Sequence, residues 1–203
     1  VAAGLVDHWS ASATADNDDT QTESHDGQTT VASVSGHAVS IGTNSGSALP
    51  SSSVSYSFVI TNTGNAAEAF AYSIASANDW GLGGGAGTTA SLEMGASETV
   101  TVVHTVSEDA SSGDSDTITF TSGSQSTTAT TTAEQNYGVS IVLSGSSDNG
   151  LVPGDQFTVT YTVTNNGNGA DSFTVFFDSS WLSSSSSTSL NLGGGSSGSA
   201  TAT

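Results

Sequence analysis

The chain has 203 residues and no lysine, arginine or cysteine, and its 19 acidic residues give it a formal net charge of −19. Because no side chain can neutralise phosphates, we expect no nucleic-acid partner. No apolar run approaches the roughly 20 residues of a membrane-spanning helix, so we expect no membrane insertion. The lack of cysteine excludes disulfides and thiolate metal ligands.

The composition favours strands and turns over helices. Hydrophobic residues make up 34% and charged residues 9% of the chain, and serine plus threonine account for about a third. Threonine is common in strands and glycine in turns, and the low charge density is not that of a disordered chain. A strongly acidic, cation-free surface rich in hydroxyls is typical of an extracellular or cell-surface setting.

The first 36 residues resemble the end of a repeating unit. The tetrapeptide that starts at Asp19 matches the one that starts at Asp116, and Gln28 matches Gln125 at the same separation of 97 residues. We therefore expect residues 1–36 to form the final strands of an immunoglobulin-like unit. A shared bias towards serine and threonine is the alternative explanation of this match.

Residues 37–136 are predicted to form one complete unit. Apolar side chains alternate with mostly polar ones from Val54 to Ile60, which predicts a half-buried strand, and Gly64 in the following turn suits a positive φ. Further strands are expected near 37–43, 70–74, 88–94, 98–106, 115–121 and 126–133. About seven short strands in about 100 residues, with turn signals between them, predict an antiparallel β-sandwich of the immunoglobulin-like type.

Residues 137–203 repeat the beginning of that unit. The segment 54–65 recurs as 157–168 at an offset of 103, and Trp80 recurs as Trp181. Weaker matches pair 39–41 with 139–141, and 92–95 with 190–193. The fold class expected is all-β, with tandem immunoglobulin-like sandwiches. We expect the last one, begun by 137–203, to be completed by a neighbouring chain or by continuation of the repeat.

The repeated segment is similar to a known class of surface domains. The runs from Ile60 to Asn65 and from Val163 to Asn168 are each followed by an acidic residue, a phenylalanine and a tryptophan: Glu68, Phe70 and Trp80 in the first copy, Asp171, Phe173 and Trp181 in the second. This pattern resembles CARDB-type repeats and immunoglobulin-like domains of archaeal and bacterial surface proteins. The resemblance implies stalks, adhesins, surface layers or filaments, and it implies no shared catalytic residues.

Acidic residues mark one candidate metal site. Asp16, Asp18 and Asp19 form the densest acidic loop, and Asp114 and Asp116 lie at the place aligned with it. Closely spaced oxygen ligands suit Ca²⁺, which often rigidifies extracellular β arrays. The pattern is not that of an EF-hand, so solvated acidic loops are the alternative. A second acidic cluster comprises Asp148, Asn149 and Asp155.

No residue pattern predicts catalysis. The four histidines lack metal-ligand spacing, no serine has a histidine and an aspartate at a recognisable spacing, and the glycine runs lack the lysine of a phosphate loop. Trp80 and Trp181 recur at one repeat position, which favours capping of a core over sugar binding. We therefore expect no enzyme.

Two functions agree with these features. The first is a structural subunit of an extracellular filament or cell-surface array, a homopolymer in which one copy's residues 1–36 complete the sandwich begun by residues 137–203 of the next. The second is an adhesin or carbohydrate-binding stalk, with glycans as partners and an exposed aromatic row or a calcium-containing pocket.

Overall fold

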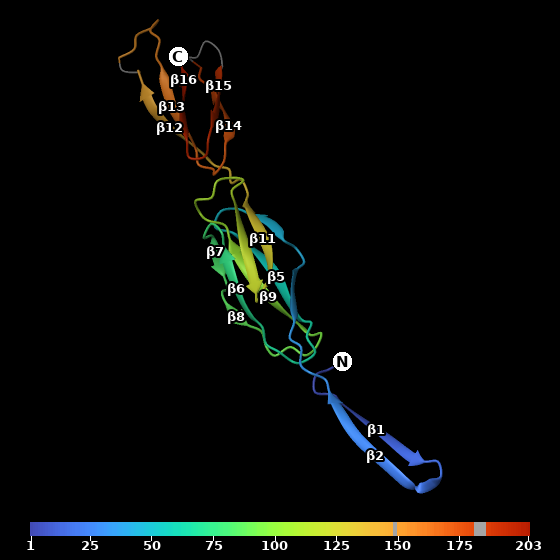
Figure 1. The fold of residues 1–203 in the computed structure, drawn as a ribbon. Coiled ribbons are helices and arrows are strands. Elements are labelled where there is room, and N and C mark those ends of the chain that lie inside the picture. Colours follow the sequence, from blue (N-terminus) through green and yellow to red (C-terminus); the bar gives the residue numbers. More distant parts are fainter. Residues whose placement is uncertain (148–149, 181–185) are drawn as a thin grey trace.

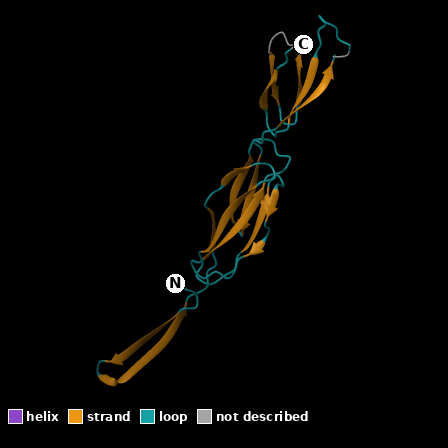
Figure 2. Cartoon of the chain, turned by 180° about the vertical axis from the view of Figure 1, so that it is seen from behind, coloured by secondary structure: helices purple, strands orange, loops and turns teal. Residues whose placement is uncertain are grey.

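The computed structural model describes residues 1–147, 150–180 and 186–203, and these contain strands and no helix. The strands fall into three segments that follow one another in an elongated molecule (Figure 1). We call them the hairpin segment (1–36), the central segment (37–136) and the C-terminal segment (137–203). Figure 2 shows the same arrangement from behind, with loops only at the ends of strands and between segments.

The hairpin segment is a single antiparallel pair of long strands. Strand β1 (Val6–Ala15) pairs with β2 (Asp18–Thr30) from Val6 opposite Thr30 to Thr14 opposite Thr22. Every residue of β1 is exposed, and the hairpin projects away from the central segment (Figure 1). Two strands alone cannot bury a core, so this segment has apolar side chains on its surface.

The central segment consists of two sheets that share one core. One sheet has the order β3 (His37–Ile41), β5 (Ser53–Asn62), β9 (Ser97–Thr105) and β7 (Gly81–Gly83). The other has the order β4 (Ser45–Ala48), β11 (Gln125–Ala133), β10 (Ser115–Ser122), β6 (Ala71–Ser76) and β8 (Gly87–Thr88). All neighbours are antiparallel except β4 and β11, which run parallel. The arrangement is that of a β-sandwich.

Aromatic stacking fills the middle of the central core. Phe58 of β5 and Phe120 of β10 are fully buried and stack with their ring centroids 4.7 Å apart, and Tyr72 of β6 also stacks on Phe120, at 5.2 Å. Tyr56 and Ile60 are buried on the same face of β5. The period of two predicted for this strand is therefore confirmed.

A second, smaller cluster closes one end of the central sandwich. Trp80, which is 9% exposed, packs there with Val106, Ala110 and Ala133. The capping role predicted for Trp80 agrees with this position. Its repeat partner Trp181 lies outside the described residues.

The C-terminal segment has two smaller sheets. Strands β12 (Val139–Ser146), β13 (Val159–Asn165) and β16 (Ser197–Ala202) form one, and β14 (Asp171–Phe177) and β15 (Ser186–Leu192) form the other. Six buried residues lie between them: Val163, Val175, Phe177, Leu192, Ala200 and Ala202. These five strands correspond to β3, β5, β9, β6 and β8 of the central segment.

The sequence patterns missed two strands and overestimated a third. Strands β4 and β7 consist of small residues without apolar alternation, so their pairing is decided by neighbouring strands. The strand expected near 88–94 is limited to the two residues of β8 and an isolated bridge between Glu68 and Leu92. Residues 89–91, between β8 and this bridge, belong to no strand.

The hydrogen bonds also correct two repeat offsets by two residues. Gly95 donates to the carbonyl of Asn62, and Gly195 donates to that of Asn165, so 92–95 corresponds to 192–195 and not to 190–193. Gly36 and Gly138 accept the equivalent bonds before β3 and β12, which makes the offset there 102. Because side chains alternate with a period of two, such a slip leaves the buried face unchanged.

Candidate assembly site

The turn after β5 is fixed by a buried asparagine. The Oδ1 atom of Asn62 accepts a hydrogen bond from the amide of Gly64 at 2.8 Å, and its Nδ2 atom donates to two carbonyls at 2.8 and 2.7 Å. Asn165 repeats this pattern after β13, with Gly167 as its amide donor at 2.9 Å. Full satisfaction of a buried amide makes each turn a rigid platform.

The second asparagine of the same turn reaches out of the sandwich to the preceding segment. Asn65 accepts a hydrogen bond at Oδ1 from the amide of Val34 at 2.7 Å, and it donates from Nδ2 to the carbonyl of Ala32 at 3.0 Å. Its own carbonyl accepts a bond from the amide of Ala3 at 2.8 Å. Asn65 therefore binds the chain on both sides of the hairpin, just before β1 and just after β2.

Asn168 makes the same junction between the central and C-terminal segments. It accepts a hydrogen bond from the amide of Asn136 at 2.7 Å and donates to the carbonyls of Glu134 and Ala110, both at 3.0 Å. Its carbonyl accepts a bond from the amide of Ser112 at 3.0 Å. One clamp, built from equivalent residues, thus joins successive segments at both junctions.

Glycine before each clamp residue allows the linker to approach closely. A Cβ atom on Gly64 would collide with the carbonyl oxygen of Val34, and one on Gly167 would collide with that of Asn136. The positive φ expected of Gly64 is wrong, because Gly64 is absent from the residues with positive φ. Close backbone contact at the junction is the reason for glycine here.

The hairpin is the structural counterpart of β10 and β11. At its base Gly4 donates to the carbonyl of Val31 and Val31 donates to that of Leu5, both at 2.9 Å. Gly113 and Ala133 make the corresponding bonds at the base of β10 and β11. Strand β1 thus matches β10 at an offset of 109, and β2 matches β11 at an offset of 102.

This equivalence corrects the alignment of Asp19 with Asp116. Asp19 lies at the tip of the hairpin, whereas Asp116 lies near the base of β10, where Asp7 is its counterpart. The tetrapeptide match paired β2 with the wrong strand of the β10–β11 hairpin. Strands rich in serine and threonine carry few large side chains that could distinguish one strand from the other.

One face of the hairpin carries a large apolar side chain. Trp9 is 51% exposed and lies directly opposite Gly27, and it fills the space that a side chain at Gly27 would occupy. In the central segment the corresponding face of β10 presents Ile118 and Phe120, both fully buried. The face of the hairpin that carries Trp9 therefore corresponds to the inner face of a strand pair, but it also holds His25 and Glu23 of β2, and among the described residues no second sheet covers it.

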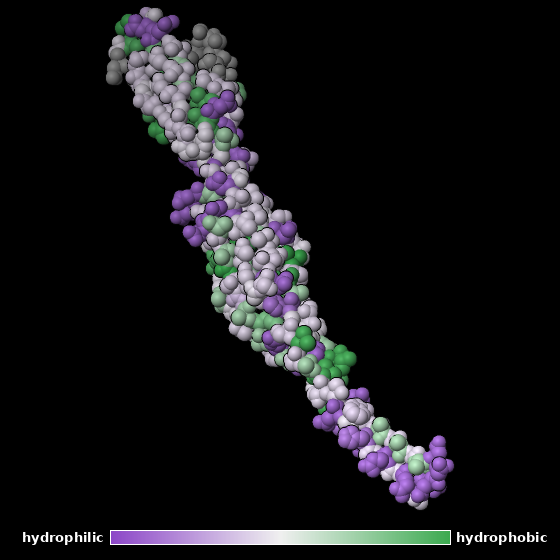
Figure 3. Space-filling model, viewed as in Figure 1, coloured by the Kyte–Doolittle hydropathy of each residue, from purple (hydrophilic) through white to green (hydrophobic). Residues whose placement is uncertain are grey.

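The C-terminal segment has an apolar cavity where the central segment has that strand pair. The cavity has a volume of about 300 Å³, and its lining includes Tyr161, Val175, Phe177 and Ala202. Among the described residues, β14 pairs only with β15, whereas its counterpart β6 also pairs with β10. Figure 3 shows hydrophobic residues at the surface of this segment, next to the atoms left grey.

A buried polar network lies beside the core of the central segment. His104 is fully buried, and its ring nitrogens lie 3.0 Å from Asp116 Oδ2 and 2.7 Å from Thr131 Oγ1. Asp116 also accepts bonds from the hydroxyl of Ser76 and from the amide of Asn78. Full burial leaves this histidine–aspartate pair no access to a substrate, so the network joins β9, β10 and β11 structurally.

Hydrogen bonds decide the ionisation of that aspartate. Burial by itself would raise the pKa of Asp116. The bonds from Ser76, Asn78 and His104 favour the charged form, and together they hold the pKa of Asp116 below its ordinary value. The carboxylate is therefore ionised at neutral pH.

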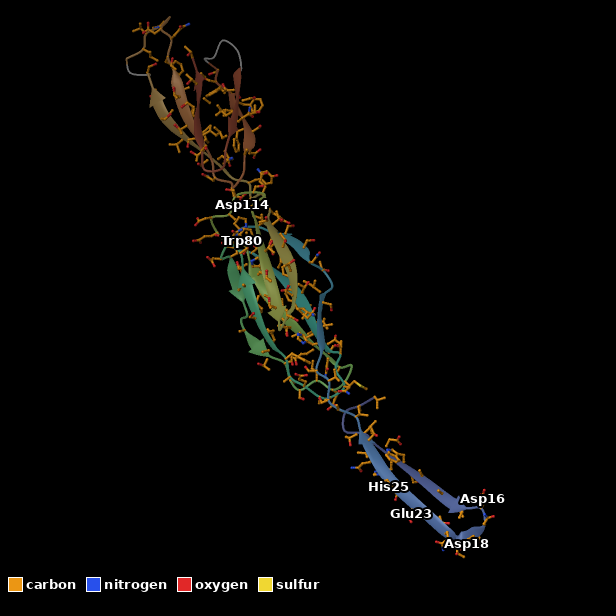
Figure 4. All side chains as sticks on the ribbon, viewed as in Figure 1. Asp16, Asp18, Glu23, His25, Trp80 and Asp114 are labelled. Atoms are coloured by element: carbon orange, nitrogen blue, oxygen red, sulfur yellow. The ribbon has the colours of Figure 1, made fainter. Side chains whose placement is uncertain are left out.

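The five aspartates proposed as calcium ligands lie in two separate places. Asp16, Asp18 and Asp19 lie at the hairpin tip, whereas Asp114 lies at the opposite end of the central segment (Figure 4) and Asp116 is buried in the network of His104. The carboxylate of Asp18 accepts bonds from Thr20, which lower its pKa. No group of three or more metal-binding side chains occurs within 1–147, 150–180 or 186–203. Of the second acidic cluster, Asp148 and Asn149 lie outside the described residues.

The exposed aromatic side chains of the described residues do not form a row. Trp9 lies on the hairpin, Tyr137 follows the second junction and Phe176 lies on β14. His8 and His25 lie exposed on the hairpin, and His37 packs against Phe70 with ring centroids 4.7 Å apart. These described residues give glycan binding no specific support, and it stays a prediction.

No family model and no curated protein matches the chain. The part of the chain that the structure describes contains no helix long and apolar enough to span a membrane.

Proposed function

We propose that this protein is a structural component of an extracellular filament or cell-surface array, made of immunoglobulin-like β-sandwich units in line. One observation carries the proposal: the hairpin joins the central segment through the same hydrogen bonds with which β10 and β11 join the C-terminal segment. Units of one chain usually move relative to one another unless their interface constrains them. A repeated clamp of backbone and asparagine bonds suits a protein whose task is to maintain length and direction.

In the proposed assembly, the hairpin of one copy completes the C-terminal sandwich of the next. The hairpin presents Trp9 and Ala11 on the face that corresponds to an inner strand pair, and the C-terminal segment presents a cavity at the position of such a pair. Strand addition satisfies backbone groups and buries apolar surface at once. A head-to-tail contact of this kind does not close on itself, so it produces fibres.

The acidic composition supports an extracellular place for this polymer. A charge of −19 without any cation keeps the sides of neighbouring fibres apart, and the hydroxyl-rich faces stay hydrated. The partner in this proposal is the same protein, and no catalytic role is assigned. The buried His104–Asp116 pair serves the core.

Light scattering and electron microscopy of the purified protein over a range of concentrations test the proposal. We expect elongated particles whose mass rises with concentration, and we expect Trp9→Asp to abolish the rise because it places a charge on the apolar face of the hairpin. His8→Asp is the matched control, because adjacent strand residues point to opposite faces. A compact monomer at every concentration would contradict the proposal.

A further inference from the structure

We infer that β1 of one copy pairs with β14 of the next in a single register, in which Ala11 faces Phe177 and Trp9 is the anchor that fills the cavity. This inference deepens the proposed function and rests on it. It names the residues that decide how two copies fit.

The register follows from the pairing inside the central segment. There β10 pairs with β6, with Phe120 opposite Ile74 and Thr121 opposite Ser73. Phe120 corresponds to Ala11 in the hairpin at the offset of 109. The turn bonds of Asn62 and Asn165 place β6 and β14 at an offset of 103.

When the register of β10 with β6 is applied to β1 and β14, three hairpin residues lie opposite β14 or the residue that follows it. Ala11 lies opposite Phe177, which corresponds to Ile74. Ser12 then lies opposite Phe176, and Ser10 opposite Asp178. The last two pairs are on the outer face, because Phe176 and Asp178 are exposed, whereas Phe177 is buried.

The pair at this register has one phenylalanine in each segment, but on opposite strands. In the central segment Phe120 faces Ile74, whereas in the proposed contact Ala11 faces Phe177. Alanine is smaller than isoleucine, so the summed volume of the pair is smaller in the proposed contact. A close-packed core requires a neighbouring side chain to fill the lost volume, and Trp9 lies two residues from Ala11 on the same face of β1.

Trp9 is larger than the residue that it replaces, Ile118, which is fully buried in the central core. Three positions that line the cavity have smaller residues than in the central segment, since Val159 replaces Tyr56, Val175 replaces Tyr72, and Ala202 replaces Val102. Two others are larger, since Phe157 replaces Val54 and Phe177 replaces Ile74. A cavity of about 300 Å³ remains there, lined by those three smaller residues among others. A larger anchor therefore meets a larger cavity, and such an aromatic anchor in a pocket dominates binding energy.

Gly27 makes the anchor available in one orientation. A side chain at this position would overlap the indole ring of Trp9, so the ring lies flat over the glycine. In the central segment the corresponding pair is Ile118 opposite Ala129. A large side chain opposite glycine fills about the same space as two smaller side chains opposite each other. It also holds the indole of Trp9 in place before the hairpin binds the next copy.

Engineered cysteines test the register directly, because the natural chain has none. Ser12→Cys is combined with Phe176→Cys, and Ser10→Cys with Asp178→Cys, as the two facing pairs. The controls are the slipped pairs, Ser10→Cys with Phe176→Cys and Ser12→Cys with Asp178→Cys. Directly opposite residues lie within disulfide reach, whereas residues slipped by two do not.

We expect mild oxidation to convert the facing pairs into covalent ladders of dimers and longer oligomers, at least tenfold faster than the slipped pairs. Faster linkage of a slipped pair, or no linkage of any pair while light scattering still detects fibres, would overturn the inference and leave the proposed function standing. Absence of fibres in the cysteine-free chain would overturn both.

The contribution of Trp9 to assembly is measured separately, as the concentration at which half of the protein is assembled. Trp9→Ala is expected to raise the concentration of half-assembly at least tenfold, and His8→Ala on the opposite face is expected to leave it within twofold. Gly27→Val is expected to act like Trp9→Ala, because it displaces the indole while retaining it. If Trp9→Ala and His8→Ala changed the concentration of half-assembly equally, Trp9 would not be the anchor.

Discussion

The central and C-terminal segments have the same turn and the same asparagine pair, but one core is closed and the other is open. In the central segment Phe120 stacks on Phe58 and on Tyr72. In the C-terminal segment the corresponding place, beside Phe177, is a cavity. Among the described residues, the C-terminal segment has no counterpart of β10 and β11, the strand pair that supplies Phe120 to the central core.

The largest expected effect is on the aromatic stack that closes the central core. Phe120→Ala removes a fully buried ring, and such substitutions lower the free energy of unfolding by about 3–5 kcal/mol. Phe177→Ala in unassembled protein is expected to cost less, because its ring already borders an open cavity. Hydrogen exchange resolved by segment measures both effects.

Phe176→Ala serves as the control for that comparison. Its side chain is 79% exposed, so the free energy of unfolding of unassembled protein is expected to change by no more than about 0.5 kcal/mol. An equal loss for Phe120→Ala and Phe177→Ala would show that the two cores are equally closed, which would contradict the comparison.

The buried network of the central segment predicts a dependence of stability on pH. The pKa of Asp116 is lower in the folded state than in the unfolded chain, so its contribution is present above about pH 4 and is lost as pH falls through the folded pKa. His104 is the titratable group in contact with this carboxylate. Urea unfolding of the central segment at pH 7, 5 and 3.5 is expected to show a loss confined to the lowest value.

Asp116→Asn sharpens that prediction. Removing the charged acceptor is expected to lower the free energy of unfolding by about 1.5–3 kcal/mol at pH 7. It should also flatten the acid dependence, because this position no longer titrates. Asp109→Asn, at an exposed loop position, is the matched control and should change neither quantity. If Asp116→Asn lost as much unfolding free energy at low pH as the natural protein does, other carboxylates would be responsible for the pH dependence.

A smaller effect is expected at the junction between the two segments. Asn168→Ala removes three side-chain hydrogen bonds to the linker and to the preceding segment, each contributing about 1 kcal/mol. We expect little change in the unfolding of either core, but a broader distribution of end-to-end distances in small-angle scattering. Asn166→Ala is the control, because Asn166 contributes none of these bonds. If both variants gave the same distribution of end-to-end distances, Asn168 would not hold the two segments in a fixed orientation.

The sequence predicted the closed core better than the junction. Alternation from Val54 to Ile60 identifies a buried face because each large side chain is apolar. The role of Asn65 and Asn168 was not found. Repetition of Asn-Thr-Gly-Asn and Asn-Asn-Gly-Asn was visible, but a turn explains such residues equally well.

The hairpin was the part that sequence reasoning aligned wrongly. Its strands have few large side chains, so the match of Asp19 to Asp116 was decided by small polar residues. Trp9 was the available signal, since it lies two residues after an aspartate, as Ile118 lies two residues after Asp116. Its position on the inner face becomes clear only from the pairing of β1 with β2.

The smallest expected effect concerns salt and the contact between copies. Each copy has a net charge of −19 and no cation, so two copies repel each other at every contact. The screening length falls from about 14 Å at 0.05 M salt to about 4 Å at 0.5 M, because it varies with the inverse square root of ionic strength. Half-assembly is therefore expected at a concentration about threefold to tenfold lower in the higher salt, as measured by light scattering.

A triple substitution at the hairpin tip tests whether the tip carboxylates cause the repulsion between copies. Asp16, Asp18 and Asp19 lie at the far end of the hairpin and would run alongside the acceptor segment in the proposed register. Replacing all three by asparagine should weaken the salt dependence and leave the facing cysteine pairs unchanged. The tip acids limit the rate and strength of docking in this scheme, while Trp9 decides where the hairpin docks. An assembly that weakened as salt rose would reverse the sign of the effect and point to a contact held by charge instead of by apolar fit.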